Sequence, residues 1–558
     1  MKQSGAKLLV EALKTRGVKH IFGLVGAQTM PVYDLLYDEP AIKCIFGRHE
    51  QCLSYACEGY AKVTGQPGVC LTEPGAGATN LLSGVAAAHC DSLPMIVITS
   101  QIPINMIGKN AIHECDLAGV FRPVVKEQFM VEQAAEMPAV IDQAFDCALS
   151  GRPGPVQVIM TTATLRQRAE PKPLRRREPQ KEPAEFEIKL QEAARILNQA
   201  KEPIIYAGYG TVQAGAVSEL HQLAEKLSAP VFTSLPARGV MSEDHPLCFG
   251  MLTFDGVGEI VSGADVCLAV GTRFSEWSTE GWRHKFPENL IQIDLDPEVI
   301  GLNYPVKLGL VADAKLVLQR LLNLVSPRSP GTLVGLAKQF KAEHALKLEK
   351  FMAQPPQFPL NPLWLLVTLR RCLPPDAIIV TDASGAQIWS CDQCFTVFQP
   401  RTLLQSETYQ EIGSSFQMAI GAKVAAPERA VVCIAGDGGI MYQLGEIATA
   451  LAHKMPILIV ILNDGYYNMP RSYQEEFYES RYIGVELNNP DFAGLAKAFG
   501  AEGHRLQSPD QLVPLVKQGL SADHLFLIDV PIDYRILPER VKKRIEQRKR
   551  DPSLRLGR

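Results

Sequence analysis

Residues 430–439 read AVVCIAGDGG, six apolar residues followed by a glycine-rich turn. A short, β-branched apolar run that is closed by glycines predicts a buried strand of a parallel sheet ending in a tight loop. Residues 441–453 have a helical composition, and residues 455–462 (MPILIVIL) form a second apolar run. The stretch therefore predicts a strand, a helix and a second strand. Asp437 and Asp464 each lie just past the carboxyl end of a strand, where the ligands of open parallel sheets bind.

The residue types at these two strand ends are those of a site for a metal ion and a diphosphate. Glycines let the main chain approach a phosphate closely. The carboxylate, amide and carbonyl oxygens of Asp437 and of the sequence LNDG at residues 462–465 suit an octahedral Mg2+ ion. The alternative is an ordinary turn between a strand and a helix. The matching second strand, which ends in Asn463 and Asp464, favours the metal site.

Length and composition indicate a globular protein with several domains. The 558 residues are too many for one core and predict about three domains of roughly 150 residues each. A content of 46% hydrophobic and 21% charged residues is that of a globular protein, and a net charge of -4 gives no reason to expect a nucleic-acid partner. Residues 1–17 have the pattern of an amphipathic helix and not of a secretory signal. Because no apolar run approaches about 20 residues, we expect a cytoplasmic protein without a membrane partner.

The cysteines are expected to be reduced. They number thirteen, an odd count, and several lie in apolar runs, as Cys70, Cys267 and Cys433 do. This pattern is typical of thiols that pack in a core and not of a disulfide framework. Cys391 and Cys394 form a single CxxC without a second pair or a histidine at ligand spacing, so a zinc or redox role there is not favoured.

Apolar runs and linker composition divide the chain into three α/β units. Residues 166–187 are rich in proline and in charges of both signs with little to bury, and residues 326–362 are partly helical and partly proline-rich. We predict an α/β fold class with three doubly wound parallel-sheet domains. The bounds are 1–165 for the first domain, 166–187 for a linker, 188–325 for the central domain, 326–362 for a second linker, 363–534 for the third domain and 535–558 for a basic tail.

Two features leave alternatives open. Glycines at 208, 210 and 271, with Arg273, follow predicted strands and suit a nucleotide, although structural turns explain them equally well. The tail from residue 535 holds ten Lys and Arg against three Asp and Glu. Such a run is typical of a solvated helix face or a mobile end, and a specific anionic partner is the less favoured alternative.

Glu50 stands out in the first domain. It lies in RHEQ at residues 48–51 and opens an Ala- and Gly-rich helix that contains EGYAK at residues 58–62. A carboxylate at a helix start with small residues behind it permits close packing around the acid. The alternative is a first-turn acid that the helix dipole favours.

These motifs together resemble the thiamine diphosphate enzymes of the acetolactate synthase group. The resemblance also rests on EPGAGATN at residues 73–80 and on the 24 residues that separate GDG from Asn463. It extends over nearly the whole chain, since RPGPV at residues 152–156 and NPDF at residues 489–492 also match. The motifs are specific because they occur in the expected order in the expected domains.

The resemblance implies three domains, named pyrimidine-binding, central and diphosphate-binding. In this group the cofactor lies between the first domain of one subunit and the third domain of another, which implies a homodimer or homotetramer. The residue that matches Glu50 hydrogen-bonds N1′ of the aminopyrimidine and favours its imino tautomer, so that the exocyclic nitrogen removes the C2 proton. This role needs a carboxylic acid that shares its proton in a dry pocket.

The resemblance also implies ligands for the rest of the cofactor. Asp437 and Asp464, with the main-chain carbonyl of Tyr466, match the Mg2+ ligands, and Ile412 matches the apolar residue that holds the cofactor in a bent shape. The remaining residues assigned to cofactor binding are Gly385, Ala386, Gln387, Gly436, Gly438, Gly439 and Met469.

Several positions depart from the pattern of the group. Asp464 replaces the usual asparagine and adds a negative charge beside the diphosphate, and Tyr473 stands where the synthases have a tryptophan. His113 lies where they have a Phe-Gln-Glu run. It is a candidate for proton transfer, with a hydrogen-bonded structural histidine as the alternative. Gln101 fits a glutamine near the substrate.

The expected activity is that of a carboligase, which decarboxylates a 2-oxo acid and adds the product to a second carbonyl compound. The alternatives are a decarboxylase or a C–C lyase of the same group. A non-catalytic regulatory homologue is less favoured, because Glu50, Ile412, Asp437 and Asn463 are all kept. The resemblance leaves open whether the central domain binds FAD.

Overall fold

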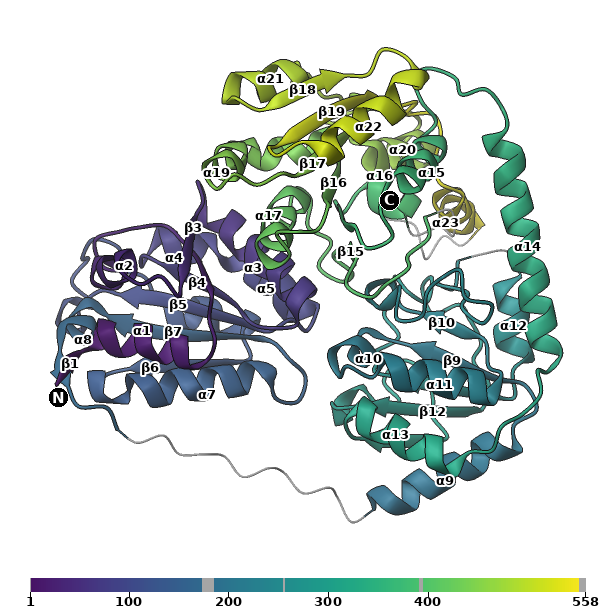
Figure 1. Ribbon diagram of the computed structural model, residues 1–558, viewed down its shortest axis with the longest axis horizontal. Helices are drawn as coiled ribbons and strands as arrows, with labels where there is room; N and C mark the ends of the chain where they lie inside the picture. Colours follow the sequence, from purple (N-terminus) through teal and green to yellow (C-terminus); the bar gives the residue numbers. More distant parts are fainter. Residues whose placement is uncertain (1, 173–184, 254–255, 391–394, 551–558) are drawn as a thin grey trace.

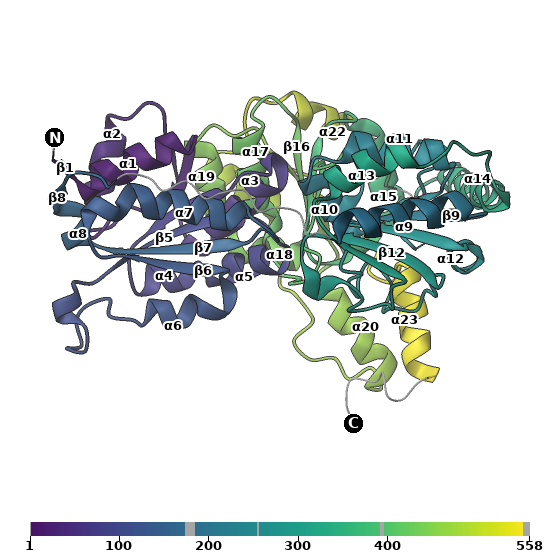
Figure 2. The same cartoon turned by 90° about the horizontal axis from the view of Figure 1, so that it is seen from below.

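The computed structural model describes residues 2–172, 185–253, 256–390 and 395–550, which form three α/β domains (Figure 1). Each domain is built on a parallel sheet with helices on both faces (Figure 2). The predicted fold class, with three doubly wound domains, is confirmed. Within the described ranges, no helix combines the length and the apolar character needed to cross a membrane.

The first domain has a six-stranded sheet in the order β3-β2-β4-β5-β7-β6. Its strands are β2 (His20–Gly23), β3 (Lys43–Phe46), β4 (Gly68–Thr72), β5 (Met95–Gln101), β6 (Glu127–Val131) and β7 (Pro155–Thr161). Its helices are α1 (Gly5–Thr15), α2 (Met30–Tyr37), α3 (Glu50–Thr64), α4 (Ala76–Asn80), α5 (Leu82–Cys90), α6 (Leu117–Phe121), α7 (Met137–Leu149) and α8 (Thr162–Arg166). Successive residues of the central strands pack into different cores, as Ile96 does beneath α1 and α7 and Val97 beneath α3 and α5. Burial on both faces explains why these strands read as continuous apolar runs.

The central domain has five parallel strands in the order β10-β9-β11-β12-β13. They are β9 (Pro203–Ala207), β10 (Val231–Thr233), β11 (Val266–Val270), β12 (Asn289–Asp294) and β13 (Leu308–Val311). The helices are α9 (Phe186–Gln199), α10 (Tyr209–Gln213), α11 (Val217–Leu227), α12 (Val257–Gly263) and α13 (Ala314–Leu324). The 21-residue helix α14 (Thr332–Met352) then leads to the third domain.

The third domain repeats a six-stranded parallel arrangement, in the order β15-β14-β16-β17-β19-β18. Its strands are β14 (Ile378–Thr381), β15 (Leu403–Leu404), β16 (Val431–Gly436), β17 (Leu458–Asn463), β18 (Glu502–Arg505) and β19 (Phe526–Pro531). Its helices are α15 (Pro362–Cys372), α16 (Gly385–Ser390), α17 (Ser415–Ala425), α18 (Asp437–Ile440), α19 (Ile447–Ala452), α20 (Asn468–Phe477), α21 (Phe492–Phe499) and α22 (Leu512–Ser521). The basic tail forms helix α23 (Glu539–Arg550).

The segment between β16 and β17 differs from the continuous helix predicted over residues 441–453. A 3-10 segment, η6 (Met441–Glu446), precedes α19, and Gln443 breaks the helical path with φ -150° and ψ 41°. The reason is a contact with the first domain. The Gln443 amide donates to Gln51 at 2.9 Å and accepts from the Cys52 thiol at 2.7 Å.

Helices α3 and α17 join the first and third domains through close main-chain contact (Figure 1). A Cβ atom on Gly59 would lie 2.1 Å from the carbonyl oxygen of Met418, and one on Gly421 would lie 1.8 Å from that of Ala56. Only glycine fits at either position, because any side chain would collide with the other helix's main chain.

The prediction of reduced cysteines is confirmed for the residues that the structure describes. The cysteines that the structure describes are all free, and Cys70, Cys267 and Cys433 are buried, as predicted for reduced core thiols. The CxxC pair at Cys391 and Cys394 lies outside the described residues, as do most of the first linker and the last eight residues of the tail.

Candidate active site

A cavity of about 140 Å³ lies at the carboxyl edge of the third sheet. Strands β16 and β17 are paired so that Gly436 lies opposite Leu462, which brings the residues after both strands to one edge. Ten of the predicted cofactor and metal residues line this cavity: Gly385, Ala386, Ile412, Gly436, Asp437, Gly438, Gly439, Asp464, Tyr466 and Met469.

Two carboxylates stand side by side in this wall. Asp437 is 3% exposed, and it accepts from the main-chain N–H of Gly465 at 2.7 Å and from the Asn489 amide at 2.6 Å. Asp464 accepts from the main-chain N–H of Tyr466 at 3.0 Å and also from the Asn468 amide. Burial raises the pKa of Asp437, while burial and then the charge of Asp437 raise the pKa of Asp464 to about 7. A divalent cation between the two groups would favour their ionised forms.

A partly buried chain of hydrogen bonds supports Asp437 from behind. The Asn489 amide donates to the side-chain oxygen of Asn463 at 3.1 Å, and the Asn463 amide donates to Asp529 at 2.8 Å. Asp529 is fully buried and also accepts from Arg505 at 2.5 Å. Sequence reasoning did not assign Asp529 a role. The signal was a single carboxylate within the apolar strand FLIDVP at residues 526–531.

Asp382, at the end of β14, is a second residue that sequence reasoning did not single out. Its carboxylate is fully buried, and Oδ1 accepts from the main-chain N–H of Gly413 at 2.8 Å. Its Oδ2 has no hydrogen-bond partner in the described part of the chain. Burial, with smaller opposing effects from hydrogen bonds, raises the pKa of Asp382 to about 6. Gly413, at φ +85°, directly follows Ile412, so Asp382 anchors the loop that presents Ile412.

The three predicted residues of the first domain gather at the edge of its own sheet. Glu50 accepts from the Asn80 amide at 2.9 Å, and a Cβ on Gly77 would lie 3.2 Å from the Glu50 carboxylate. Gln101 is buried at the end of β5, and its amide donates to the carbonyl of Cys115 at 3.1 Å.

His113 lies at the same edge as Glu50 and Gln101. It has φ +66°, and a Cβ on Gly75 would come within 3.0 Å of its Cα atom. None of the three residues lines the third-domain cavity of the same chain. Gln387 also lies outside that lining, because its buried amide is turned to the carbonyl of Ser406 at 2.6 Å.

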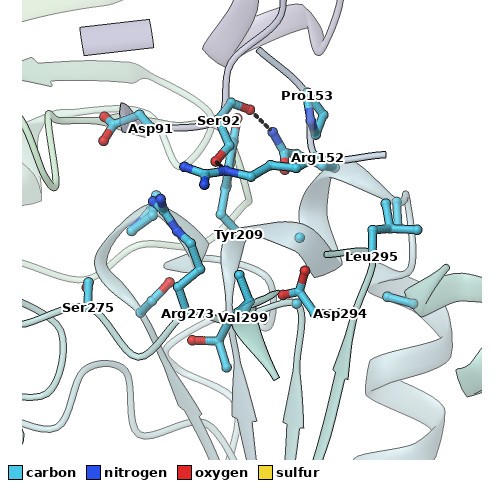
Figure 3. A pocket seen from close by; sticks show the side chains of 18 of the residues that line it. Asp91, Ser92, Arg152, Pro153, Tyr209, Arg273, Ser275, Asp294, Leu295 and Val299 are labelled. Carbon is cyan, nitrogen blue, oxygen red and sulfur yellow. Dashed lines mark hydrogen bonds between the residues drawn. The ribbon is translucent and has the colours of Figure 1, made fainter. Parts of the chain in front are cut away.

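A separate cavity of about 80 Å³ lies at the carboxyl edge of the central sheet (Figure 3). It lies where the strand order reverses between β9 and β11, which is where nucleotides bind in open α/β sheets. The side chains of Arg152, Arg273 and Asp294 all line this cavity (Figure 3). The Arg152 guanidinium donates to the Ser92 hydroxyl at 2.8 Å, and burial raises the pKa of Asp294 to about 6.

Comparison with known proteins accounts for all three domains. Residues 3–120 match the thiamine pyrophosphate enzyme N-terminal TPP binding domain, residues 190–321 the central domain, and residues 382–530 the C-terminal TPP binding domain. The chain is 34% identical over 552 residues to a probable acetolactate synthase large subunit of Methanocaldococcus jannaschii, covering 95% of this chain and 92% of that protein. It is 32% identical over 550 residues to the acetolactate synthase isozyme 3 large subunit of Escherichia coli (strain K12), covering 95% of each.

The fold and the site define a three-domain α/β enzyme that binds thiamine diphosphate. The chain belongs to the thiamine pyrophosphate enzyme family and is one of its C–C bond-forming enzymes. The resemblance that the motifs indicated is therefore confirmed. The comparisons favour the predicted carboligase over the decarboxylase, lyase and regulatory alternatives.

Proposed function

We propose that the protein decarboxylates a small 2-oxo acid and joins the remaining fragment to the carbonyl carbon of a second small carbonyl compound. The observation that carries this proposal is the convergence of ten predicted cofactor and metal residues on one cavity at the ends of β14, β16 and β17. Relatives named acetolactate synthase support a 2-oxo acid as the donor. When bound, thiamine diphosphate supplies a nucleophilic carbon and takes up the electron pair that decarboxylation releases.

The donor set of the third domain fits Mg2+ and a diphosphate. We assign the metal to Asp437, Asp464 and the main-chain carbonyl of Tyr466, all in the cavity wall. Among the described residues, no group of three or more His, Cys, Asp or Glu side chains is arranged to hold a metal ion. Two carboxylates and a main-chain carbonyl are oxygen ligands, which suit a hard ion that completes its shell with phosphate oxygens. Gly436 supports the phosphate site, because a Cβ there would meet nothing closer than Ser384 at 3.7 Å, which leaves open space beside the main chain.

The proposed role of Glu50 is to hold a proton at N1′ of the aminopyrimidine. Its position at the start of α3 fixes the carboxylate against Asn80 and Gly77. Ile412 is 42% exposed on a loop that Asp382 anchors, which suits an apolar prop for the bent cofactor. We assign Gln101 and His113, from the same edge as Glu50, to contacts with the substrate.

We further propose that two copies of the chain form each complete site. Glu50 does not line the third-domain cavity of its own chain, so a partner's first domain has to supply the acid. Exposed apolar side chains support this assembly. Ile107 and Ile112 are 51% and 83% exposed in the first-domain loop after β5, and Met441 and Tyr442 are 44% and 57% exposed in the third domain. Such side chains are typical of a surface that another protein covers.

FAD is a proposal for the central cavity. Arg152 and Arg273 suit a diphosphate, and the close approach of Gly208 to Gly271, where a Cβ would lie 2.1 Å from a carbonyl oxygen, brings main chain to the cavity edge. A purified protein that shows the flavin absorption bands would support this assignment. A colourless protein that gains no flavin when FAD is added would refute it.

The test of the proposed function is product analysis. The enzyme is incubated with thiamine diphosphate, Mg2+ and a panel of 2-oxo acids, alone and in pairs, and the products are identified by mass spectrometry and NMR. We expect CO2 and a product that carries a new C–C bond. Free aldehyde as the only organic product would refute the carboligase assignment. Light scattering of the holoenzyme tests the assembly, for which we expect a dimer or tetramer.

A further inference from the structure

A third, larger cavity of about 540 Å³ lies between the C-terminal helix α23 and the central-domain segment 276–283. Five arginines line it: Arg283 from the central domain and Arg540, Arg544, Arg548 and Arg550 from α23. The acidic residues in the lining are Glu276 and Glu280, so arginines exceed acids by three. The proposed carboligase reaction assigns no role to this cavity.

Helix α23 is held in a fixed orientation. Val541 and Ile545, one turn apart, are buried in a cluster with Ile388 of α16 and with Tyr473 and Phe477 of α20. Figure 2 shows α23 beside α20. Since these two apolar residues define the inner face of the helix, its arginines are held in place on the face beside segment 276–283.

Two aromatic residues fix the arginines themselves. The Arg540 guanidinium lies 4.3 Å from the ring centroid of Trp277 and donates to the Trp277 carbonyl. The Arg548 guanidinium lies 4.9 Å from the ring of Tyr473. Stacked guanidinium groups lose little further freedom when they bind an anion in a bidentate manner.

The two glutamates do not balance the positive charge. Glu280 forms an ion pair with Arg283 and lies 3.8 Å from Nε of Arg540, while Glu276 lies 3.2 Å from Arg544. Glu546, outside the lining, lies 3.9 Å from Arg550, which still leaves five arginines against three neighbouring glutamates. The pKa of Arg283 lies below its ordinary value, because burial and then the charge of Arg540 disfavour the cation. The cavity therefore gathers positive charge that an anion would stabilise.

The cavity beside α23, called the arginine-rich cavity below, is next to the third-domain cavity proposed for the cofactor, called the cofactor cavity below. Leu537 and Pro538 line the cofactor cavity, and Arg540, two residues further along, lines the arginine-rich cavity. Met469 and Leu537 of the cofactor cavity pack in the same cluster as Trp277 of the arginine-rich cavity. A ligand could extend its charged end among the arginines while its other end reaches toward the cofactor.

We propose that the arginine-rich cavity binds the phosphate group of an anionic ligand. Two sources share this chemistry: a phosphate-bearing tail on the substrate, which rests on the proposed carboligase function, and a separate phosphate-bearing effector, which does not. A volume of about 540 Å³ accommodates a ligand with more than one phosphate. Arginine is suited to this task because its planar fork matches phosphate oxygens.

The experiment measures phosphate binding to the holoenzyme. The enzyme is saturated with thiamine diphosphate and Mg2+, so that the third-domain site is filled, and is titrated with inorganic phosphate at constant ionic strength. The change in tryptophan fluorescence, to which Trp277 in the cavity wall contributes, reports binding. We expect saturation in the unmodified protein and a Kd about tenfold higher for Arg544→Gln, the effect of losing one charge-assisted contact.

The matched control is Lys542→Gln. Lys542 is on the same helix, is similarly exposed at 53% against 43% for Arg544, and also makes one surface ion pair, but it does not line the cavity. We expect its Kd to change less than about twofold, because exposed charges are screened. No saturable binding, or equal losses in both variants, as would follow if phosphate entered the central cavity instead, would overturn the proposal.

Kinetics then distinguish a phosphate-bearing substrate from a separate effector. They also distinguish failure of this inference from failure of the proposed carboligase function. A phosphate-bearing 2-oxo acid whose kcat/KM falls in Arg544→Gln but not in Lys542→Gln identifies the substrate tail. Inorganic phosphate that changes kcat without competing with the substrate identifies an effector. New C–C bonds without phosphate binding refute this inference and keep the carboligase. Phosphate binding without C–C bond formation would support this inference and refute the carboligase function.

Discussion

The first and third domains share one strand order and differ in what their strand ends carry. Numbered along each domain, the six strands lie in the order second, first, third, fourth, sixth and fifth in both sheets. In the third domain, the third and fourth strands lead into Asp437 and Asp464, which line one cavity. In the first domain, the corresponding strands β4 and β5 end at Thr72 and Gln101. The shared topology supplies a common edge, and the residues at that edge determine its chemistry.

Two acids near the strand ends of the first domain, Glu73 and Glu50, have different roles from each other. Glu73, directly after β4, accepts from the main-chain N–H groups of Gln28 and Thr29 at 2.9 and 2.8 Å, so it stabilises a loop. The acid assigned to chemistry is Glu50, at the start of the helix after the second strand. The helix in the same place in the third domain is α17, and Ile412 precedes it. One domain thus presents an acid where the other presents an apolar side chain.

The largest effect is expected from changing the two acids of the first domain. Glu50→Gln should lower kcat by about 10²–10⁴-fold, because general acid–base catalysis is lost, while thiamine diphosphate still binds. Glu73→Gln should mainly lower the free energy of unfolding. Steady-state kinetics, calorimetric titration with the cofactor and chemical denaturation measure the three quantities. Loss of turnover in Glu73→Gln with full activity in Glu50→Gln would reverse the assignment.

The proposed metal site of the third domain gives the next effect. Asp437→Asn should weaken binding of Mg2+ in the presence of thiamine diphosphate about 100-fold, because a charged ligand is lost. Asp529→Asn, which acts through Asn463, should weaken it about tenfold. Titration of each variant with Mg2+ measures both affinities. Equal effects would show that Asp529 contributes more than orientation, and unchanged affinity in Asp437→Asn would remove Asp437 from the metal site.

The contact between the two domains predicts a stability effect. Gly421→Ala should lower the free energy of unfolding by about 1–3 kcal/mol, since its Cβ would lie 1.8 Å from the Ala56 carbonyl oxygen. Gly335→Ala is the control, because a Cβ on this glycine of α14 meets nothing within 4 Å. We expect the control to gain up to about 1 kcal/mol from better helix propensity. Urea denaturation compares them, and equal changes would contradict the packing argument.

The first strands of the two domains differ as well, and the effect expected there appears only over part of the pH range. Strand β14 leads into the buried Asp382, whereas β2 ends at Gly23. Because the folded-state pKa of Asp382 is raised from 3.8 to about 6, the unfolded chain releases this proton first, and stability should fall as pH rises from about 4 to about 6.

Asp382→Asn keeps an oxygen for the Gly413 N–H and removes this dependence. The variant should be more stable than the unmodified protein by up to about 3 kcal/mol above pH 6 and equal to it below pH 4. Denaturation at several pH values without cofactor tests this. Parallel curves for the two proteins would show that Asp382 does not titrate in this range.

Local patterns predicted the strands and their carboxyl ends well. The apolar runs at residues 430–435 and 455–462 form strands β16 (Val431–Gly436) and β17 (Leu458–Asn463), and their parallel pairing brings Asp437 and Asp464 to one edge. Periodicity reports which residues are buried and where a strand stops, which is sufficient for a site built at strand ends.

The residues that sequence reasoning missed form hydrogen bonds with residues far away in the sequence. Asp382 bonds to Gly413, 31 residues away, and Asp529 bonds to Asn463, 66 residues away. The break at Gln443 is caused by Gln51 and Cys52 of another domain. Local propensity cannot predict these contacts, since they follow from sheet register and domain packing.

The glycine contacts between α3 and α17 restrict how this sequence can change over evolution. When two side chains collide, trimming one of them makes room for the other, so such positions drift in pairs. At Gly59 and Gly421 the opposing group is a main-chain carbonyl, which no substitution can shorten. Neither glycine therefore has a compensating partner, and the spacing between the two cofactor-binding domains is fixed by the polypeptide backbone itself.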